Sequence, residues 1–304
     1  MSHVAEMETL HIQTIDNQSF SAYLWQQQQP KGTVHIVHGM AEHCQRYTPL
    51  ARHLHAAGYR VVTHNHRGHG DRTPQGHYAD QNGWELVIDD MLKVQKAVCG
   101  DEPAILFAHS MGSFIAQGFA IRYGQRLSGL VLSGSNYQAP GLYYAGQTVA
   151  RLLKVFQGGR TQSGVMDTLS FTSFNNQFKP ARTDFDWLSR DQRQVDNYIQ
   201  DQACGHRCSL QLWIDLFDGL IEISNKKNLA KIPSDLPIYL FAGDQDPVGQ
   251  KGKGVIALEQ ALKQSGHQAV SCKLYPDARH EMLNELNADE VCQDILNWIQ
   301  TTVR

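Results

Sequence analysis

Short apolar runs alternate with segments of helical periodicity along most of this chain. The runs predict β-strands, at residues 21–25, 33–38, 59–63, 103–107, 130–133, 237–241 and 270–275. Between two of them, Asn82 followed by Glu85 indicates a helix start with an N-terminal cap. Val87, Met91, Val94 and Val98 then recur at helical spacing and form one buried stripe. Strands that alternate with helices predict an α/β fold with a mostly parallel sheet covered on both faces.

The first two of these runs, residues 21–25 and 33–38, follow each other with no helical segment between them. Parallel neighbours need a long crossover connection, whereas antiparallel neighbours can be joined by a short turn. We therefore expect these two strands to pair as an antiparallel hairpin at one edge of the sheet.

The alternation stops at about Asn136 and resumes near Pro233. Residues 171–178 form a polar and aromatic stretch, and residues 210–217 form a helix that is apolar on nearly every side. Such a helix is either fully buried or presents apolar surface to a ligand. We interpret the segment as a helical cap inserted into a core, so that residues 1–135 and 233–304 form the core and residues 136–232 form the cap. A plain structural insertion remains the alternative.

Composition limits the classes of partner. The 304 residues are 19% charged and 41% hydrophobic, and the formal charge of −3 gives no reason to expect nucleic acid or an anionic surface as a partner. The first residues have no basic start and no apolar core, so we expect no secretory signal. No apolar run approaches the roughly 20 residues of a membrane span. A cytoplasmic location is the expectation, with peripheral membrane contact through the cap left open.

Histidines and cysteines raise the question of a metal site. His64, His66 and His69 alternate in the sequence, but they surround Arg67, and a cation beside a divalent metal is unfavourable. The six cysteines are scattered, and no second pair joins Cys204 and Cys208 in a zinc pattern. We therefore expect buried thiols, no metal and no cofactor.

Ser110 lies where a predicted strand meets a predicted helix. The strand at residues 103–107 leads into it, and small residues flank it, with Ala108 before and Gly112 after. This arrangement is typical of a nucleophile elbow, where a sharp turn exposes the serine and the helix N-terminus favours negative charge. A tight structural junction would give the same pattern.

A serine hydroxyl needs a general base, and the base needs an orienting group. Two loops that leave predicted strands can supply both. Residues 241–248 contain Asp244 and Asp246, and residues 275–281 contain His280. The chain order is therefore serine, acid, histidine, which is the order expected behind a nucleophile elbow.

Together these motifs resemble the α/β-hydrolases of the monoacylglycerol lipase and lysophospholipase type. The matching pieces are HGMAEH at residues 38–43, RGHG at 67–70, AHSMG at 108–112, GDQDP at 243–247 and RHE at 279–281. The resemblance covers nearly the whole chain, including FDWLSRD at residues 185–191 in the cap. It implies the α/β-hydrolase fold, with a mostly parallel eight-stranded sheet, helices on both faces and an inserted helical cap.

The resemblance also implies a catalytic role for each of these residues. It makes Ser110 the nucleophile, His280 the base and Asp246, before Pro247, the acid, which leaves Asp244 as a turn residue and the alternative acid. The oxyanion would be held by two backbone N–H groups. One is that of Met111, directly after the nucleophile, and the resemblance places the other at Met40.

Residues that follow Met40 suggest how its loop is held. Glu42, His43, Arg46 and Tyr47 are polar or charged, and we expect them to form a buried network that fixes the loop. Arg67 is expected to pair with an acid and hold neighbouring loops together rather than take part in chemistry.

The function that follows is hydrolysis of the carboxylic ester of a single-acyl lipid, such as a monoacylglycerol or lysophospholipid, through an acyl-enzyme. A short-chain esterase and a serine peptidase are rivals on the same fold, and a non-catalytic binding protein is a rival of another class. The sequence leaves acyl length, head group and oligomeric state open.

Overall fold

The apolar runs of the sequence form a single eight-stranded sheet in the order β1-β2-β4-β3-β5-β6-β7-β8. The computed structural model describes residues 7–303, so the first six residues, which bear on the expected lack of a secretory signal, lie outside the described residues. The strands are β1 (Glu8–Gln13), β2 (Ser19–Trp25), β3 (Thr33–Val37), β4 (Arg60–His64), β5 (Ala104–His109), β6 (Leu127–Ser133), β7 (Ile238–Gly243) and β8 (Val270–Tyr275). All pairs from β4 onward to β8 are parallel, as predicted.

The predicted antiparallel pairing of β2 with β3 is wrong. β2 pairs antiparallel with β1 on one side and with β4 on the other, whereas β3 lies inside the sheet between β4 and β5. Every residue of β3 is buried, which is the pattern of a central parallel strand. β1 was not predicted because it lies at the edge and only Ile12 among its residues is buried.

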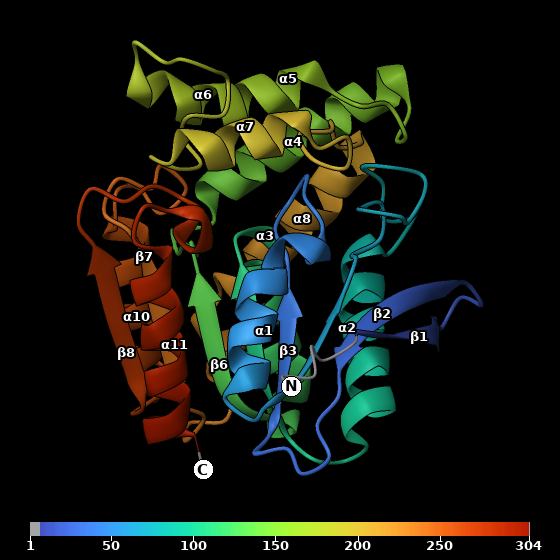
Figure 1. Ribbon diagram of the computed structural model, residues 1–304. Coiled ribbons are helices and arrows are strands. Elements are labelled where there is room, and N and C mark those ends of the chain that lie inside the picture. Colours follow the sequence, from blue (N-terminus) through green and yellow to red (C-terminus); the bar gives the residue numbers. More distant parts are fainter. Residues whose placement is uncertain (1–6, 304) are drawn as a thin grey trace.

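Helices cover both faces of the sheet, and the sheet separates two large apolar cores. Helices α1 (Thr48–Ala56) and α11 (Ala288–Thr302) pack against one face (Figure 1). Helices α2 (Gly83–Cys99), α3 (Met111–Tyr123) and α10 (Lys253–Gln264) pack against the other. The expected stripe of α2 is confirmed for Val87, Met91 and Val94, which are fully buried, whereas Val98 at its end is only half-buried. The predicted N-terminal cap of α2 is not formed, because Asn82 adopts a left-handed conformation and its side chain makes no capping hydrogen bond.

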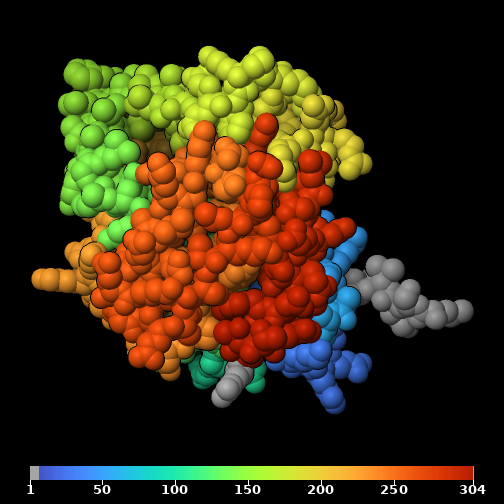
Figure 2. All heavy atoms as spheres, turned by 90° about the vertical axis from the view of Figure 1, so that its left-hand side faces the viewer, coloured from blue at the N-terminus to red at the C-terminus, as the bar shows by residue number. Residues whose placement is uncertain are grey.

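The segment between β6 and β7 forms a helical layer, here called the cap (residues 136–232), over the carboxyl ends of the strands (Figure 1). Its helices are α4 (Gly141–Gln157), α5 (Gly164–Asp167), α6 (Ser173–Asn175), α7 (Gln192–Gln200) and the start of α8 (Leu210–Ile223). The short helix α9 (Lys226–Leu229), at the end of the segment, packs against α10 instead, near the amino end of β8. Figure 2 shows the green and yellow cap seated on the orange and red C-terminal part of the core. Helix α8 joins the two layers, because it contacts α4 above and α2 and α3 below.

None of the helices described between residues 7 and 303 is long and apolar enough to cross a membrane.

Candidate active site

Ser110 occupies a strained turn between β5 and α3. Its backbone has φ 52° and ψ −123°, a conformation that non-glycine residues rarely adopt and that needs support from the surrounding structure. The small neighbours are required by close packing. A Cβ on Gly112 would lie 2.4 Å from the carbonyl oxygen of His38, and Ala108 is fully buried in β5. The turn therefore holds the Ser110 hydroxyl at the carboxyl edge of the sheet, beneath the cap.

The structure brings Ser110, His280 and Asp246 into one hydrogen-bonded row. His280 Nε2 lies 2.8 Å from Ser110 Oγ, and His280 Nδ1 lies 3.0 Å from both carboxylate oxygens of Asp246. A carboxylate only accepts, so Nδ1 carries the proton and Nε2 is free to accept the serine proton. Asp244 is used elsewhere, because its Oδ1 accepts the backbone N–H of Asp277 at 2.8 Å. The geometry therefore fits Asp246, not Asp244, as the acid.

The environment of His280 favours its charged form. Burial disfavours the imidazolium, but the adjacent carboxylate of Asp246, with a smaller contribution from Glu281, raises the pKa of His280 above its usual value. His109 packs 4.7 Å away between ring centres, and burial lowers its pKa to about 3. His109 is thus neutral at pH 7 and adds no charge beside the base. Its Nδ1 lies 3.2 Å from Ser133 Oγ, so it packs under the elbow.

Met40 lies in the loop after β3, whose backbone is fixed from both sides. His38 donates from Nδ1 to the carbonyl oxygen of Gly39 at 2.7 Å, and the Gly39 N–H donates to Glu42 Oε1 at 2.6 Å. Among the described residues, no acceptor pairs with the backbone N–H of Met40 or of Met111. Both N–H groups are therefore available to a ligand beside Ser110.

The expected network around Glu42 is present without His43, which bonds to Gln45 and Asp201 instead, and it reaches further than the sequence indicated. Glu42 also accepts the Tyr47 hydroxyl at 2.8 Å and Arg46 Nη1 at 2.6 Å. Arg46 forms a bidentate pair with Glu281, with both nitrogen–oxygen distances 2.6 Å. Glu281 directly follows His280, so one arginine ties the Met40 loop to the histidine loop. No pattern in the sequence indicated this pair, because 235 residues separate its members.

Comparison with known proteins assigns the chain to a family. A family model for serine aminopeptidases, S33, matches residues 28–287. The chain belongs to this family. Monoacylglycerol lipase of Mycolicibacterium smegmatis is 26% identical over 274 residues, covering 89% of this chain and 88% of that protein. Monoglyceride lipase of Rattus norvegicus is 27% identical over 298 residues, covering 96% and 89%.

A solved structure is also closely similar to this S33 hydrolase. The carboxyl esterase from Bacillus coagulans, in complex with glycerol, matches with a TM-score of 0.90 and 29% identity, covering 98% of this chain and 99% of that one. These findings confirm the predicted α/β-hydrolase fold and the resemblance to the monoacylglycerol lipase type. The protein is a carboxylic ester hydrolase.

Two cavities of opposite character meet at Ser110 in this hydrolase. One, of about 500 Å³, is mainly apolar and runs between α4 and α8, where it is lined by Val149, Trp213, Leu216 and Phe217. The other, of about 870 Å³, has charged groups from the cap in its wall, namely Lys179, Arg182, Arg207, Asp167 and Asp184. The helix predicted at residues 210–217, which is apolar on nearly every side, is thus both buried, as α8, and part of the wall of a cavity. An ester placed on Ser110 would have an apolar and a polar side to extend into.

Replacing Glu42 with alanine should lower kcat by about 10- to 100-fold while the protein stays folded. The change frees the Gly39 N–H and the Tyr47 hydroxyl, so the Met40 loop can shift, and a displacement of about 1 Å is enough for an effect of this size. Arg46 keeps its pair with Glu281, which limits the loss of stability. Steady-state kinetics and circular dichroism on the same preparation test this. Unchanged turnover would show that the network does not position the loop.

Proposed function

We propose that this hydrolase cleaves the ester of a single-acyl lipid, a monoacylglycerol or a lysophospholipid, through an acyl-enzyme on Ser110. His280 acts as the general base, Asp246 orients it, and the backbone N–H groups of Met40 and Met111 hold the oxyanion. Residues 136–232 form the cap that shapes the acyl and alcohol sides of the site. The observation that carries this proposal is that a mainly apolar cavity and a second cavity with charged groups in its wall both reach Ser110.

In the first half of the reaction, His280 Nε2 takes the proton of Ser110 as Oγ attacks the ester carbonyl. The 2.8 Å distance between these atoms allows direct transfer. The negative charge that develops on the carbonyl oxygen is stabilised by the two backbone N–H groups. Collapse of this intermediate expels the alcohol, which receives the proton from His280, and leaves the acyl group on Ser110.

In the second half, water repeats the sequence. His280 removes a proton from the water, the hydroxide attacks the acyl carbonyl, and the fatty acid leaves as Ser110 regains its proton. Asp246 keeps the Nδ1 proton of His280 in place and stabilises the imidazolium in both halves. Every step uses side chains and backbone groups of the described site.

The choice of a single-acyl lipid rests on the shape and lining of the cavities. A volume of about 500 Å³ is within the usual range for small-molecule sites, and its aromatic and aliphatic wall suits one hydrocarbon chain. The charged groups of the second cavity suit a polar alcohol or head group. The names of the relatives from M. smegmatis and R. norvegicus point to the same substrate class.

Blocking the apolar cavity should separate long-chain from short-chain activity. Val149 is half-buried on α4 and lines this cavity, so Val149→Trp should lower kcat/KM for long-chain monoacylglycerols by about 10-fold or more and spare acetyl and butyryl esters. Thr148→Trp on the same helix is the matched control, because Thr148 is exposed, lines neither of the cavities described above and lies outside the apolar surface of α4. The measurement is hydrolysis across an acyl-length series.

The same series tests the proposal against its rivals. Wild-type activity that rises with chain length, and falls selectively in Val149→Trp, supports the lipid-directed reading. Activity confined to short chains would make the protein a general esterase. Hydrolysis of an aminoacyl amide in preference to every ester would favour a peptidase, as in the name of the matching family.

We further propose that the cap touches membranes peripherally. Large apolar side chains are exposed on α4, namely Leu142, Tyr144, Leu152, Val155 and Phe156. Substituting Val155 and Phe156, which are 78% and 84% exposed, with serine should lower co-sedimentation with phosphatidylcholine liposomes severalfold and leave hydrolysis of a soluble ester unchanged. Unaltered sedimentation would dismiss this contact.

A further inference from the structure

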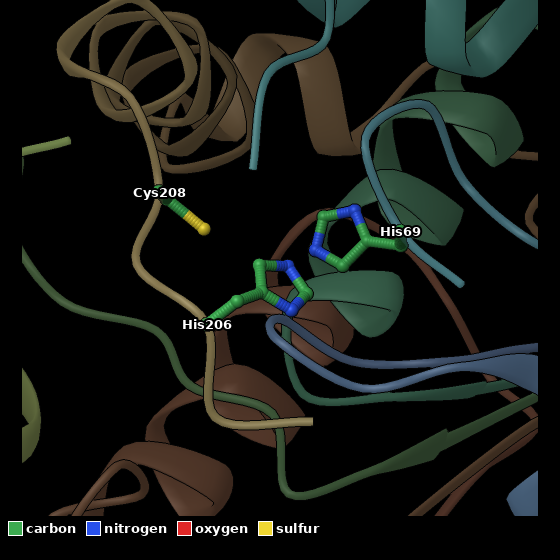
Figure 3. Close-up of side chains that lie close together, drawn as sticks. All are labelled: His69, His206 and Cys208. Atoms are coloured by element: carbon green, nitrogen blue, oxygen red, sulfur yellow. The ribbon is translucent and has the colours of Figure 1, made fainter. Parts of the chain in front are cut away.

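Two histidines and a cysteine from distant parts of the chain converge behind the Met40 loop. His69 belongs to the loop after β4, whereas His206 and Cys208 belong to the cap segment that precedes α8 (Figure 3). One ligand atom from each lies within 4.8 Å of the others. In Figure 3 the two imidazoles and the thiol point toward a common space. The ring centres of His69 and His206 are 5.1 Å apart.

Hydrogen bonds fix both imidazoles in the form that ligates through Nε2. His69 Nδ1 lies 2.9 Å from the carbonyl oxygen of Arg67, and His206 Nδ1 lies 3.2 Å from that of Ala203. A carbonyl oxygen only accepts, so Nδ1 carries the proton in each ring and Nε2 keeps its lone pair. A backbone carbonyl on the far nitrogen is the usual support of a metal-binding histidine.

The three ligand atoms also lack other partners. Neither His69 Nε2 nor His206 Nε2 has a hydrogen bond among the described residues, although both atoms are buried. His69 and Cys208 are completely buried, and Cys208 is a free thiol. Buried polar atoms are nearly always paired, so two that share one space indicate a ligand.

The charges nearby do not oppose a cation. The guanidinium of Arg67, which counted against a metal in the sequence, pairs instead with Asp16 and Asp90. Arg207 pairs with Asp167 through Nε at 2.9 Å.

We propose that His69, His206 and Cys208 bind a zinc ion that fastens the cap to the core. Neutral imidazoles and a thiolate are the ligands that Zn²⁺ favours, and a water would complete a tetrahedral set. Two Nε2 lone pairs and the Cys208 sulfur form the bonds to the metal, and the thiol proton is released to solvent. Zn–N distances of about 2.0 Å and Zn–S of about 2.3 Å require the three side chains to close in slightly.

A neighbouring group of similar composition serves as a control rather than a rival. His43, Asp201 and Cys204 also lie within 4.8 Å of one another. Both nitrogens of His43 are already used, because Nε2 lies 2.7 Å from Asp201 and Nδ1 lies 2.7 Å from Gln45. This group therefore has its partners without a metal.

The position of the site gives the metal a structural consequence. The segment that carries His206 and Cys208 is already attached to the core, because the Gly205 N–H donates to the carbonyl of Ala41 and the Ser209 N–H donates to that of Gly76. Ala41 directly follows Met40. A zinc ion would thus hold this part of the cap against the loop that supplies a proposed oxyanion donor.

The test is titration of the chelator-treated, full-length protein with Co²⁺ and with Zn²⁺. Cobalt bound to a thiolate gives a charge-transfer absorption in the near ultraviolet, which reports the Cys208 bond directly. We expect one equivalent to bind, and Zn²⁺ to displace the cobalt signal. Because one proton leaves with each ion, the apparent affinity should rise about tenfold per pH unit below the thiol pKa.

Matched variants identify the site. Cys208→Ser should lose the charge-transfer band and weaken Zn²⁺ binding by at least about 100-fold, whereas Cys204→Ser should retain both. His206→Gln, on the surface side of the cluster, provides a second variant if Cys208→Ser does not fold, and it should also lose tight binding. Absence of stoichiometric binding by the wild type, or equal binding by Cys208→Ser, would overturn the proposal.

Discussion

Ser110→Ala should lower kcat for ester hydrolysis by roughly 10⁵- to 10⁶-fold, the loss expected when the nucleophile of a triad is removed. The Ser110 hydroxyl makes its one side-chain hydrogen bond to His280, and alanine is no larger, so the fold should be preserved. The activity that remains would come from substrate binding and the oxyanion donors. Initial rates on a monoacylglycerol, with thermal unfolding alongside, provide the measurement.

Ser135→Ala is the matched control for this result. Ser135 is a buried serine near the same edge of the sheet, and its hydroxyl bonds to Gln117 rather than to His280. It should keep wild-type turnover and should react with a fluorophosphonate probe, which should not label Ser110→Ala. If Ser110→Ala keeps more than a small fraction of the wild-type activity, the assignment of Ser110 as the nucleophile is wrong. Failure of the probe on native protein would revive the non-catalytic alternative.

The sheet was largely readable from the sequence because most of its strands are buried on both sides. Fully apolar runs such as β5 and β7 give a strong signal without any knowledge of their neighbours. The same holds for the order of Ser110, the acid and His280, since the carboxyl ends of parallel strands gather at one edge. Local patterns thus specify which residues come to that edge.

The features that could not be predicted from the sequence depend on contacts between distant segments. β1 is an exposed edge strand, so its apolar signal is weak. Arg46 pairs with Glu281, and His69 packs beside His206, although each pair is far apart in the chain. The residues next to each of them in the sequence do not indicate its partner. Arg67 was expected to pair with an acid, and it does, but its partners Asp16 and Asp90 could not be named from the sequence because they lie far from it in the chain.

Asp246→Asn should lower kcat by roughly 10⁴-fold, the second largest effect expected of this site. Asparagine has nearly the same shape, but its amide can donate to Nδ1 of His280 and so favours the wrong tautomer. The carboxylate that stabilises the imidazolium is also lost. His280 remains completely surrounded by protein, so nothing else compensates for the missing charge.

The pH profile distinguishes this role from a merely structural one. In the wild type, Asp246 raises the pKa of His280, so the acid limb of kcat/KM should lie above pH 6.5, with activity lost as His280 becomes protonated. In Asp246→Asn, burial acts without the carboxylate, so the limb should move to lower pH although the rates are small. Asp244→Asn is the control, because asparagine can still accept the Asp277 N–H, and both its rate and its limb should match the wild type. A limb that shifts in Asp244→Asn and not in Asp246→Asn would exchange the roles of the two acids, because only the carboxylate that faces His280 can set its protonation.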